Sequence, residues 1–145
     1  MRGSCLCGAV VFELSGVVPD LYQCHCSLCR KVTGSSANAA IRIAAQQFRW
    51  IRGSEQISRY ATDSGYRSHF CRACGSPLPN PRGDGSGYWV PAGLLDDTAD
   101  LNLAAHLYVG SRATWDVIAD TGQHFDEMPN AAALDEILRH GKPGA

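Results

Sequence analysis

The sequence predicts a mainly β fold, formed as one domain over residues 1–145 and decorated with short helices. Its length suits a single domain that buries its own core. Short runs typical of strands recur along most of the chain. Gly, Ser, Asp and Pro separate these runs, as turns require, and only two segments carry helix signals.

The strand-like runs are short and rich in β-branched and aromatic residues. They lie at residues 9–14, 39–43, 48–51, 57–60, 66–70, 88–90 and 106–109. Between two of them, segment 77–87 contains three Pro and three Gly. Such a segment is typical of a loop, and we expect it to border a cleft.

Residues 27–32 and residues 131–140 carry the helix signals. We expect the first helix to stop near Gly34. In the second, Asn130 can cap the start and Gly141 can end it. One face of this helix is apolar, so we expect it to pack on a sheet. That face consists of Leu134, Ile137 and Leu138.

Thirteen basic and 14 acidic residues give the chain a formal net charge of −1. This balance lacks the basic footprint of proteins that bind nucleic acids or anionic membranes, so we expect neither partner. No apolar run approaches the length of a membrane span, and the first residues lack the apolar core of a signal peptide. We therefore expect a cytoplasmic protein with reduced thiols, which favours metal ligands over disulfides.

The seven cysteines form three clusters with the spacing of metal ligands. They are Cys5 and Cys7, then Cys24, Cys26 and Cys29, then Cys71 and Cys74. The first and last pairs together supply the four ligands of a structural zinc site. Gly75 suits a tight turn after the last pair, and the first pair would place two sulfurs on one side of a strand. A metal here would close a long loop between residues 5–7 and 71–74, which suits a structural role. The alternative is that these four residues are buried core cysteines without a metal.

The middle cluster has three thiols within six residues and no evident local fourth ligand. Three protein ligands with one open position are the pattern of catalytic zinc. Four other readings stay open: a share in the first metal, a redox dithiol at Cys26 and Cys29, an iron–sulfur cluster, or His25 as fourth ligand. We expect His25 to point away, because neighbouring side chains in an extended chain face opposite sides. Zinc is the interpretation we favour.

These motifs resemble those of the glutathione-dependent formaldehyde-activating enzyme family, which also includes centromere protein V. The resemblance covers about residues 3–129. It rests on Gly-Ser-Cys-Leu-Cys-Gly at 3–8, Cys-His-Cys-Ser-Leu-Cys-Arg at 24–30 and Phe-Cys-Arg-Ala-Cys-Gly-Ser at 70–76, and more weakly on 106–109, Trp115 and 125–129.

The resemblance implies a complex β fold with a zinc-ribbon element, one structural zinc and one labile zinc. The implied structural ligands are Cys5, Cys7, Cys71 and Cys74. The implied labile and catalytic site consists of Cys24, Cys26 and Cys29. The family's named activity adds formaldehyde to the thiol of glutathione, giving S-hydroxymethylglutathione, which is a carbon–sulfur lyase reaction in reverse. Glutathione has two carboxylates, so arginines near the cleft are expected; the candidates by neighbourhood are Arg30, Arg67 and Arg82.

The expected function is therefore a zinc-dependent carbon–sulfur lyase-like enzyme acting on adducts of small aldehydes with glutathione or a similar thiol. The alternative is a zinc-binding interaction module without catalysis. A methionine sulfoxide reductase on a similar scaffold is disfavoured, because such enzymes need a nucleophilic cysteine outside the metal knuckles and no cysteine follows Cys74.

Overall fold

The structure is a computed structural model that describes residues 1–139. Within these residues it contains three β-sheets and two α-helices, which confirms the mainly β fold with short helices. No helix in this part of the chain combines the length and apolarity needed to cross a membrane. Four short 3-10 turns connect the strands, at Ala45–Gln47, Ser54–Gln56, Ala92–Leu94 and Val109–Ser111.

The largest sheet has six strands in the order β12-β11-β3-β4-β10-β9. Its strands are β3 (Leu21–Cys24), β4 (Asn38–Ala44), β9 (Asn80–Pro81), β10 (Gly87–Pro91), β11 (Leu103–Leu107) and β12 (Gln123–Phe125). Strand β11 pairs in parallel with both β3 and β12, and the other pairs are antiparallel. The parallel pairing places the carboxyl ends of β3 and β11 side by side, with Cys24 opposite Leu107.

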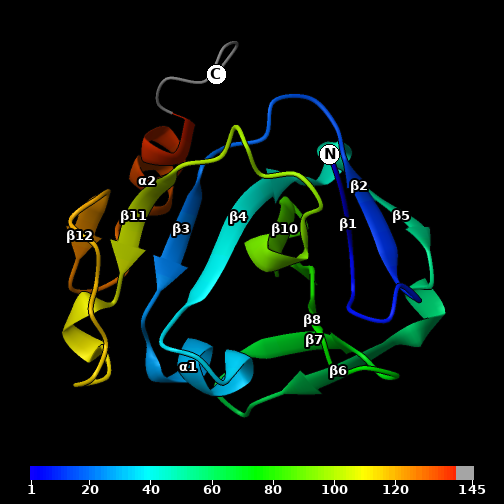
Figure 1. Cartoon of the computed structure of the whole chain (residues 1–145), viewed down its shortest axis with the longest axis horizontal. Helices are drawn as coiled ribbons and strands as arrows, with labels where there is room; N and C mark the ends of the chain where they lie inside the picture. The colour runs from blue at the N-terminus through cyan, green and yellow to red at the C-terminus, as the bar shows by residue number, and fades with distance from the viewer. Residues whose placement is uncertain (140–145) are drawn as a thin grey trace.

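Two three-stranded sheets complete the fold. One contains β1 (Arg2–Ser4), β2 (Val11–Leu14) and β5 (Phe48–Arg52), and the other contains β6 (Ile57–Ala61), β7 (Arg67–Cys71) and β8 (Pro77–Leu78). In Figure 1 the β6–β7 hairpin lies across the lower end of the molecule, beside α1. Phe12, Ile41 and Val90 are fully buried between the β2 and β4 sheets and form the centre of one core cluster.

Helix α1 (Ser27–Thr33) follows β3 directly, as the helix signals predict. The Cys26 sulfur caps its start by accepting from the Cys29 amide at 3.4 Å. Gly34 ends the helix with a left-handed φ of 64°, and its amide donates to the Arg30 carbonyl. The helix therefore holds Cys26 and Cys29 on one turn beside the end of β3.

Helix α2 (Ala131–Arg139) packs against the large sheet near β11. Asn130 caps it, because its side-chain oxygen accepts from the Ala132 amide at 2.9 Å. Leu134 and Leu138 are buried in the same core cluster as Cys24 and Cys29, which confirms the apolar face. The predicted final residue and stop of this helix lie outside the described residues; they are His140 and Gly141.

Two local predictions were wrong. Segment 77–87 is not a plain loop, because it contains β8, β9 and the first residue of β10. Both short strands lie at sheet edges, where Pro is tolerated since one side needs no backbone donor. The predicted strand at 106–109 ends at Leu107, because Tyr108 turns into the left-handed region with a φ of 56°.

Candidate metal centres

The first cysteine pair lies in a tight turn after β1, not on a strand as predicted. The Gly8 amide donates to the Cys5 carbonyl at 2.9 Å, and Gly8 has a left-handed φ of 73°. The Cys5 amide also donates to the Val10 carbonyl, while the Val10 amide donates to the Cys5 sulfur at 3.3 Å. This turn brings the Cys5 and Cys7 sulfurs to 3.5 Å.

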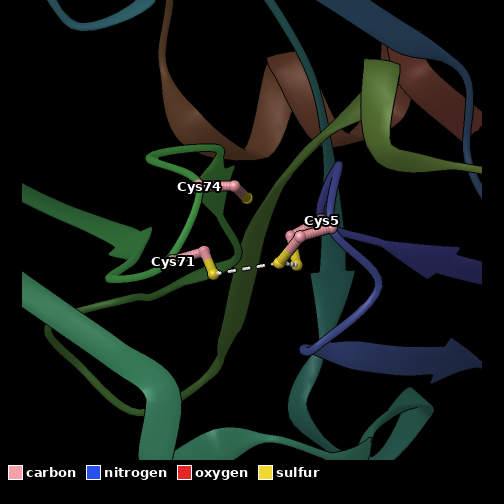
Figure 2. Close-up of side chains that lie close together, drawn as sticks. Cys5, Cys71 and Cys74 are labelled. Atoms are coloured by element: carbon pink, nitrogen blue, oxygen red, sulfur yellow. Dashed lines mark hydrogen bonds between the residues drawn. The ribbon is translucent and has the colours of Figure 1, made fainter.

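A second turn of the same kind follows β7. The Cys71 amide donates to the Ser76 carbonyl, and the Gly75 amide donates back to the Cys71 carbonyl at 2.8 Å. Gly75 has a φ of 76°, the left-handed conformation that its position predicted. Figure 2 shows Cys71 and Cys74 on this turn facing Cys5 on the other. Two turns far apart in the sequence therefore aim their sulfurs at one point.

The four sulfurs of Cys5, Cys7, Cys71 and Cys74 all lie within 4.8 Å of one another. The Cys7 and Cys71 sulfurs are 3.8 Å apart. Tetrahedral zinc with Zn–S bonds of about 2.3 Å separates its sulfurs by about 3.8 Å, so this set fits zinc. The Ser76 hydroxyl lies 3.3 Å from the Cys74 sulfur and lowers the pKa of that thiol to about 5.

The middle cysteines converge where β3 meets α1. Cys24 is the last residue of β3, Cys26 caps α1, and Cys29 lies in its first turn. Their three sulfurs lie within 4.8 Å of one another. A hydrogen bond with Cys29 lowers the pKa of the Cys24 thiol to about 6, and the same bond raises the pKa of Cys29. The cluster thus favours a thiolate, the form in which cysteine binds metals.

His25 points away from the three sulfurs, as expected. Its Nδ1 lies 2.7 Å from the Asp116 carboxylate and its Nε2 lies 3.0 Å from Nδ1 of His106. Both ring nitrogens are therefore engaged. Among residues 1–139, no fourth His, Cys, Asp or Glu joins the group of three sulfurs. The donor set fits a soft metal with one position left for an outside ligand.

A cavity of about 440 Å³ lies between α1 and one face of the β6–β7 hairpin. It is lined by Leu28, Lys31, Val32, Tyr60, Thr62, Tyr66, Ser68, Phe70, Gly75 and Pro77. Burial raises the pKa of Tyr66 to about 12, and the charges of Cys29, Cys26 and Cys24 contribute. Leu28, Lys31 and Val32 line the cavity from α1, the helix that also carries Cys29. We expected segment 77–87 to border a cleft, and Pro77 of this segment lines the cavity.

None of the three candidate arginines lines this cavity. Arg30 donates to the Ser111 carbonyl at 3.3 Å, and Arg82 lies 3.7 Å from the Asp84 carboxylate. Arg67 lines a separate cavity of about 430 Å³, with residues of the other face of the hairpin. Arg67 points away from the first cavity because alternate residues of a strand face opposite sides. The positive charge in the first cavity comes from Lys31.

Comparison with known proteins agrees with the motif resemblance. A sequence profile described as glutathione-dependent formaldehyde-activating enzyme matches residues 1–111. A Halomonas elongata protein named for the same enzyme is 35% identical over 85 residues, 54% of each chain. An uncharacterized lyase of Schizosaccharomyces pombe is 26% identical over 77% of this chain and 80% of its own length.

One crystal structure, of a Rhodobacter sphaeroides protein, is similar with a TM-score of 0.56 and 29% identity. The similarity covers 66% of this chain and 88% of that one. The present chain thus spans about half of the Halomonas relative and most of the other two proteins. Because the profile match includes both cysteine groups described above, the chain belongs to the glutathione-dependent formaldehyde-activating enzyme family.

Proposed function

We propose that this chain is a zinc-dependent carbon–sulfur lyase-like enzyme that joins glutathione, or a similar small thiol, to formaldehyde or another small aldehyde. One zinc would be structural and held by four cysteines. A second zinc would be held by Cys24, Cys26 and Cys29 and take part in the reaction. Family membership supports the reaction class, and the two groups of converging sulfurs support the metals.

The observation that carries this proposal is the three-sulfur group without a fourth protein ligand in residues 1–139. His25 is the nearest alternative in the sequence, and both its nitrogens are held by other side chains. A zinc ion bound by three cysteines would lower the pKa of an incoming thiol and favour its reactive thiolate form. The residues of the chain then have two tasks, to hold the thiol and to orient the aldehyde.

The cavity beside α1 suits the rest of the thiol molecule. Tyr60, Tyr66 and Phe70 provide an aromatic wall, and Lys31 can pair with a carboxylate such as those of glutathione. In the addition, the sulfur of the thiol forms a bond to the aldehyde carbon and the carbonyl π bond breaks. The proton released by the thiol ends on the former carbonyl oxygen. The reaction needs no oxidant or reductant, which agrees with a chain whose cysteines converge as free thiols.

The direct test is calorimetry of the zinc-loaded protein with glutathione, in two buffers of different ionisation heat. Binding at the open position should release a proton, because the thiol must ionise before it can act as a ligand. Affinity should therefore rise with pH until the pKa of the free thiol is reached. S-methylglutathione, whose sulfur cannot form a thiolate, should bind far more weakly.

Equal binding of glutathione and S-methylglutathione without proton release would show that the thiol is not a metal ligand. Binding of neither compound would favour the alternative, a zinc-stabilised interaction module without catalysis. A catalytic role also requires that the protein accelerate adduct formation from glutathione and formaldehyde, and that Cys26→Ser abolish the acceleration. The variant Ser27→Ala, which changes the exposed neighbouring residue, is the matched control.

A further inference from the structure

A buried row of polar side chains leads away from the three-cysteine group. It runs from the Asp116 carboxylate to His25, from His25 to His106, and from His106 to the Thr121 carbonyl, with contacts of 2.7, 3.0 and 3.0 Å. The side chain of Asp116 is 7% exposed, and His25 and His106 are 2% and 0% exposed. Asp116 and Thr121 both lie beyond residue 111, where the family match ends.

The row ends at each side on an oxygen atom that can accept a hydrogen bond, the Asp116 carboxylate and the Thr121 carbonyl. Both ring nitrogens of His25 and of His106 therefore have a partner within 3.0 Å. Buried groups of this kind are costly to leave unpaired, so the row resists rearrangement.

The row fixes the position of His25, the residue between two of the three cysteines. His25 separates Cys24 from Cys26, and its own amide donates to the Leu107 carbonyl at 2.9 Å. The His25 ring is thus fixed by two side-chain contacts while its backbone is fixed to β11. A shift or rotation of His25 would move the residues that carry the Cys24 and Cys26 sulfurs. The row is therefore placed to set the geometry of the three-sulfur group.

We propose that Asp116 is a positioning residue for the three-cysteine site and acts through His25 to keep its sulfurs converged. This inference rests on the proposed function, in which that site holds a metal. Loss of residues that orient ligands in known metal sites lowers affinity about 10-fold to 100-fold. Asp116→Ala removes the acceptor for His25 and should speed zinc release from the three-cysteine site at least about tenfold. The four-cysteine site lies outside the row and should release zinc at its normal rate.

Asp116→Asn separates hydrogen bonding from charge. An Asn amide can donate to Nδ1 of His25, so a hydrogen bond at this position can be kept without the charge of the carboxylate. This variant should release zinc within about threefold of the native rate, whereas a purely electrostatic role would make it resemble Asp116→Ala. The control is Asp120→Ala, which removes an exposed carboxylate from the same loop.

The experiment follows the kinetics of zinc release to a chromogenic chelator. The kinetic phase that is missing in Cys26→Ser is assigned to the three-cysteine site. Selective acceleration of that phase by Asp116→Ala, restored by Asp116→Asn, supports the proposal. Native release of both phases from Asp116→Ala overturns it, and so does an Asp116→Asn variant as defective as Asp116→Ala. If Asp116→Ala is insoluble, Asp116→Glu displaces the carboxylate while keeping its charge and should show the same selective loss.

A metal-independent readout separates this inference from the proposed function. If native protein shows no phase that depends on Cys26, the proposed catalytic zinc is wrong. Positioning is then judged by hydrogen exchange of the His25 amide, which Asp116→Ala should accelerate and Asp116→Asn should not. Unchanged exchange in Asp116→Ala overturns the positioning role whatever the metal content.

Discussion

The two cysteine groups differ most in how far apart their members lie along the chain. Cys7 and Cys71 are 64 residues apart, whereas Cys24, Cys26 and Cys29 lie on one strand end and one helical turn. By the loop-entropy estimate used for covalent cross-links, closing a loop of 64 residues is worth about 4 kcal/mol and closing one of six residues about 2 kcal/mol. A metal at the first group would therefore stabilise tertiary structure, while a metal at the second would mainly organise a local segment.

Burial does not separate the two groups. Each contains two buried cysteines and one half-buried cysteine, and the four-cysteine group adds the exposed Cys7. The number of ligands and the segments that supply them therefore distinguish the two sites.

The variant Cys71→Ser should prevent stable folding. Zinc at a structural site contributes on the order of 10 kcal/mol of apparent binding free energy, comparable to the whole stability of a domain. We expect insoluble expression or loss of cooperative thermal unfolding, measured by circular dichroism together with zinc content. A soluble Cys71→Ser protein with native melting and full zinc content would refute the structural assignment.

The variant Cys26→Ser should keep the fold and lose about one zinc per chain, because a three-ligand site tolerates no further loss of ligands. Elemental analysis measures the zinc, and thermal unfolding checks the fold. Ser27→Ala should keep both zinc ions. Equal zinc content in Cys26→Ser and native protein would refute the second zinc site. The contrast between a closed and an open metal centre would then be wrong.

The variant Lys31→Ala should weaken binding of glutathione about fivefold, because one exposed ion pair is worth about 1 kcal/mol. Lys31 lines the cavity beside the open site. Binding of 2-mercaptoethanol, which has no carboxylate, should not change, and Lys31→Arg should retain most of the affinity for glutathione. Calorimetry with both thiols makes the comparison. Equal losses for the two thiols would mean that Lys31 does not recognise a carboxylate.

Much of the site could be predicted because its ligands are local in the sequence. The spacing within each pair and the glycine after Cys74 indicate tight turns, and the structure brings together the same two groups of cysteines that spacing predicted. The first turn was placed wrongly on a strand, because a spacing of two residues also fits a turn closed by Gly8. The spacing of the two cysteines alone does not distinguish a strand from a turn.

What could not be predicted depends on contacts between distant segments. Strand β3 lacks a clear alternating pattern and forms because β4 and β11 pair with it on either side. The contact of His25 with Asp116 joins residues 91 positions apart. No local pattern in the sequence identifies Asp116 among the acidic residues of its loop. Such partners become visible only when the parallel pairing of β3 with β11 brings the two segments together.

The smallest expected effect comes from a matched pair of glycines, one beside each site. Gly75 and Gly34 have left-handed φ angles of 76° and 64°, and an added Cβ meets nothing within 4 Å at either position. Gly75→Ala and Gly34→Ala should therefore each lower the free energy of unfolding by about 1 kcal/mol through backbone strain alone. Denaturant unfolding of both variants measures this loss.

Zinc release should distinguish the two variants. Gly75 closes the turn that carries Cys71 and Cys74, so strain there moves sulfurs of the four-cysteine site and should speed its zinc release a few-fold, about the factor expected for 1 kcal/mol. Gly34 ends α1 five residues after Cys29, and its strain can relax by loosening the last helical turn. Gly34→Ala should therefore leave zinc release from both sites unchanged. Faster release from the three-cysteine site in Gly34→Ala would mean that this site depends on the whole helix and is less local than its spacing indicates.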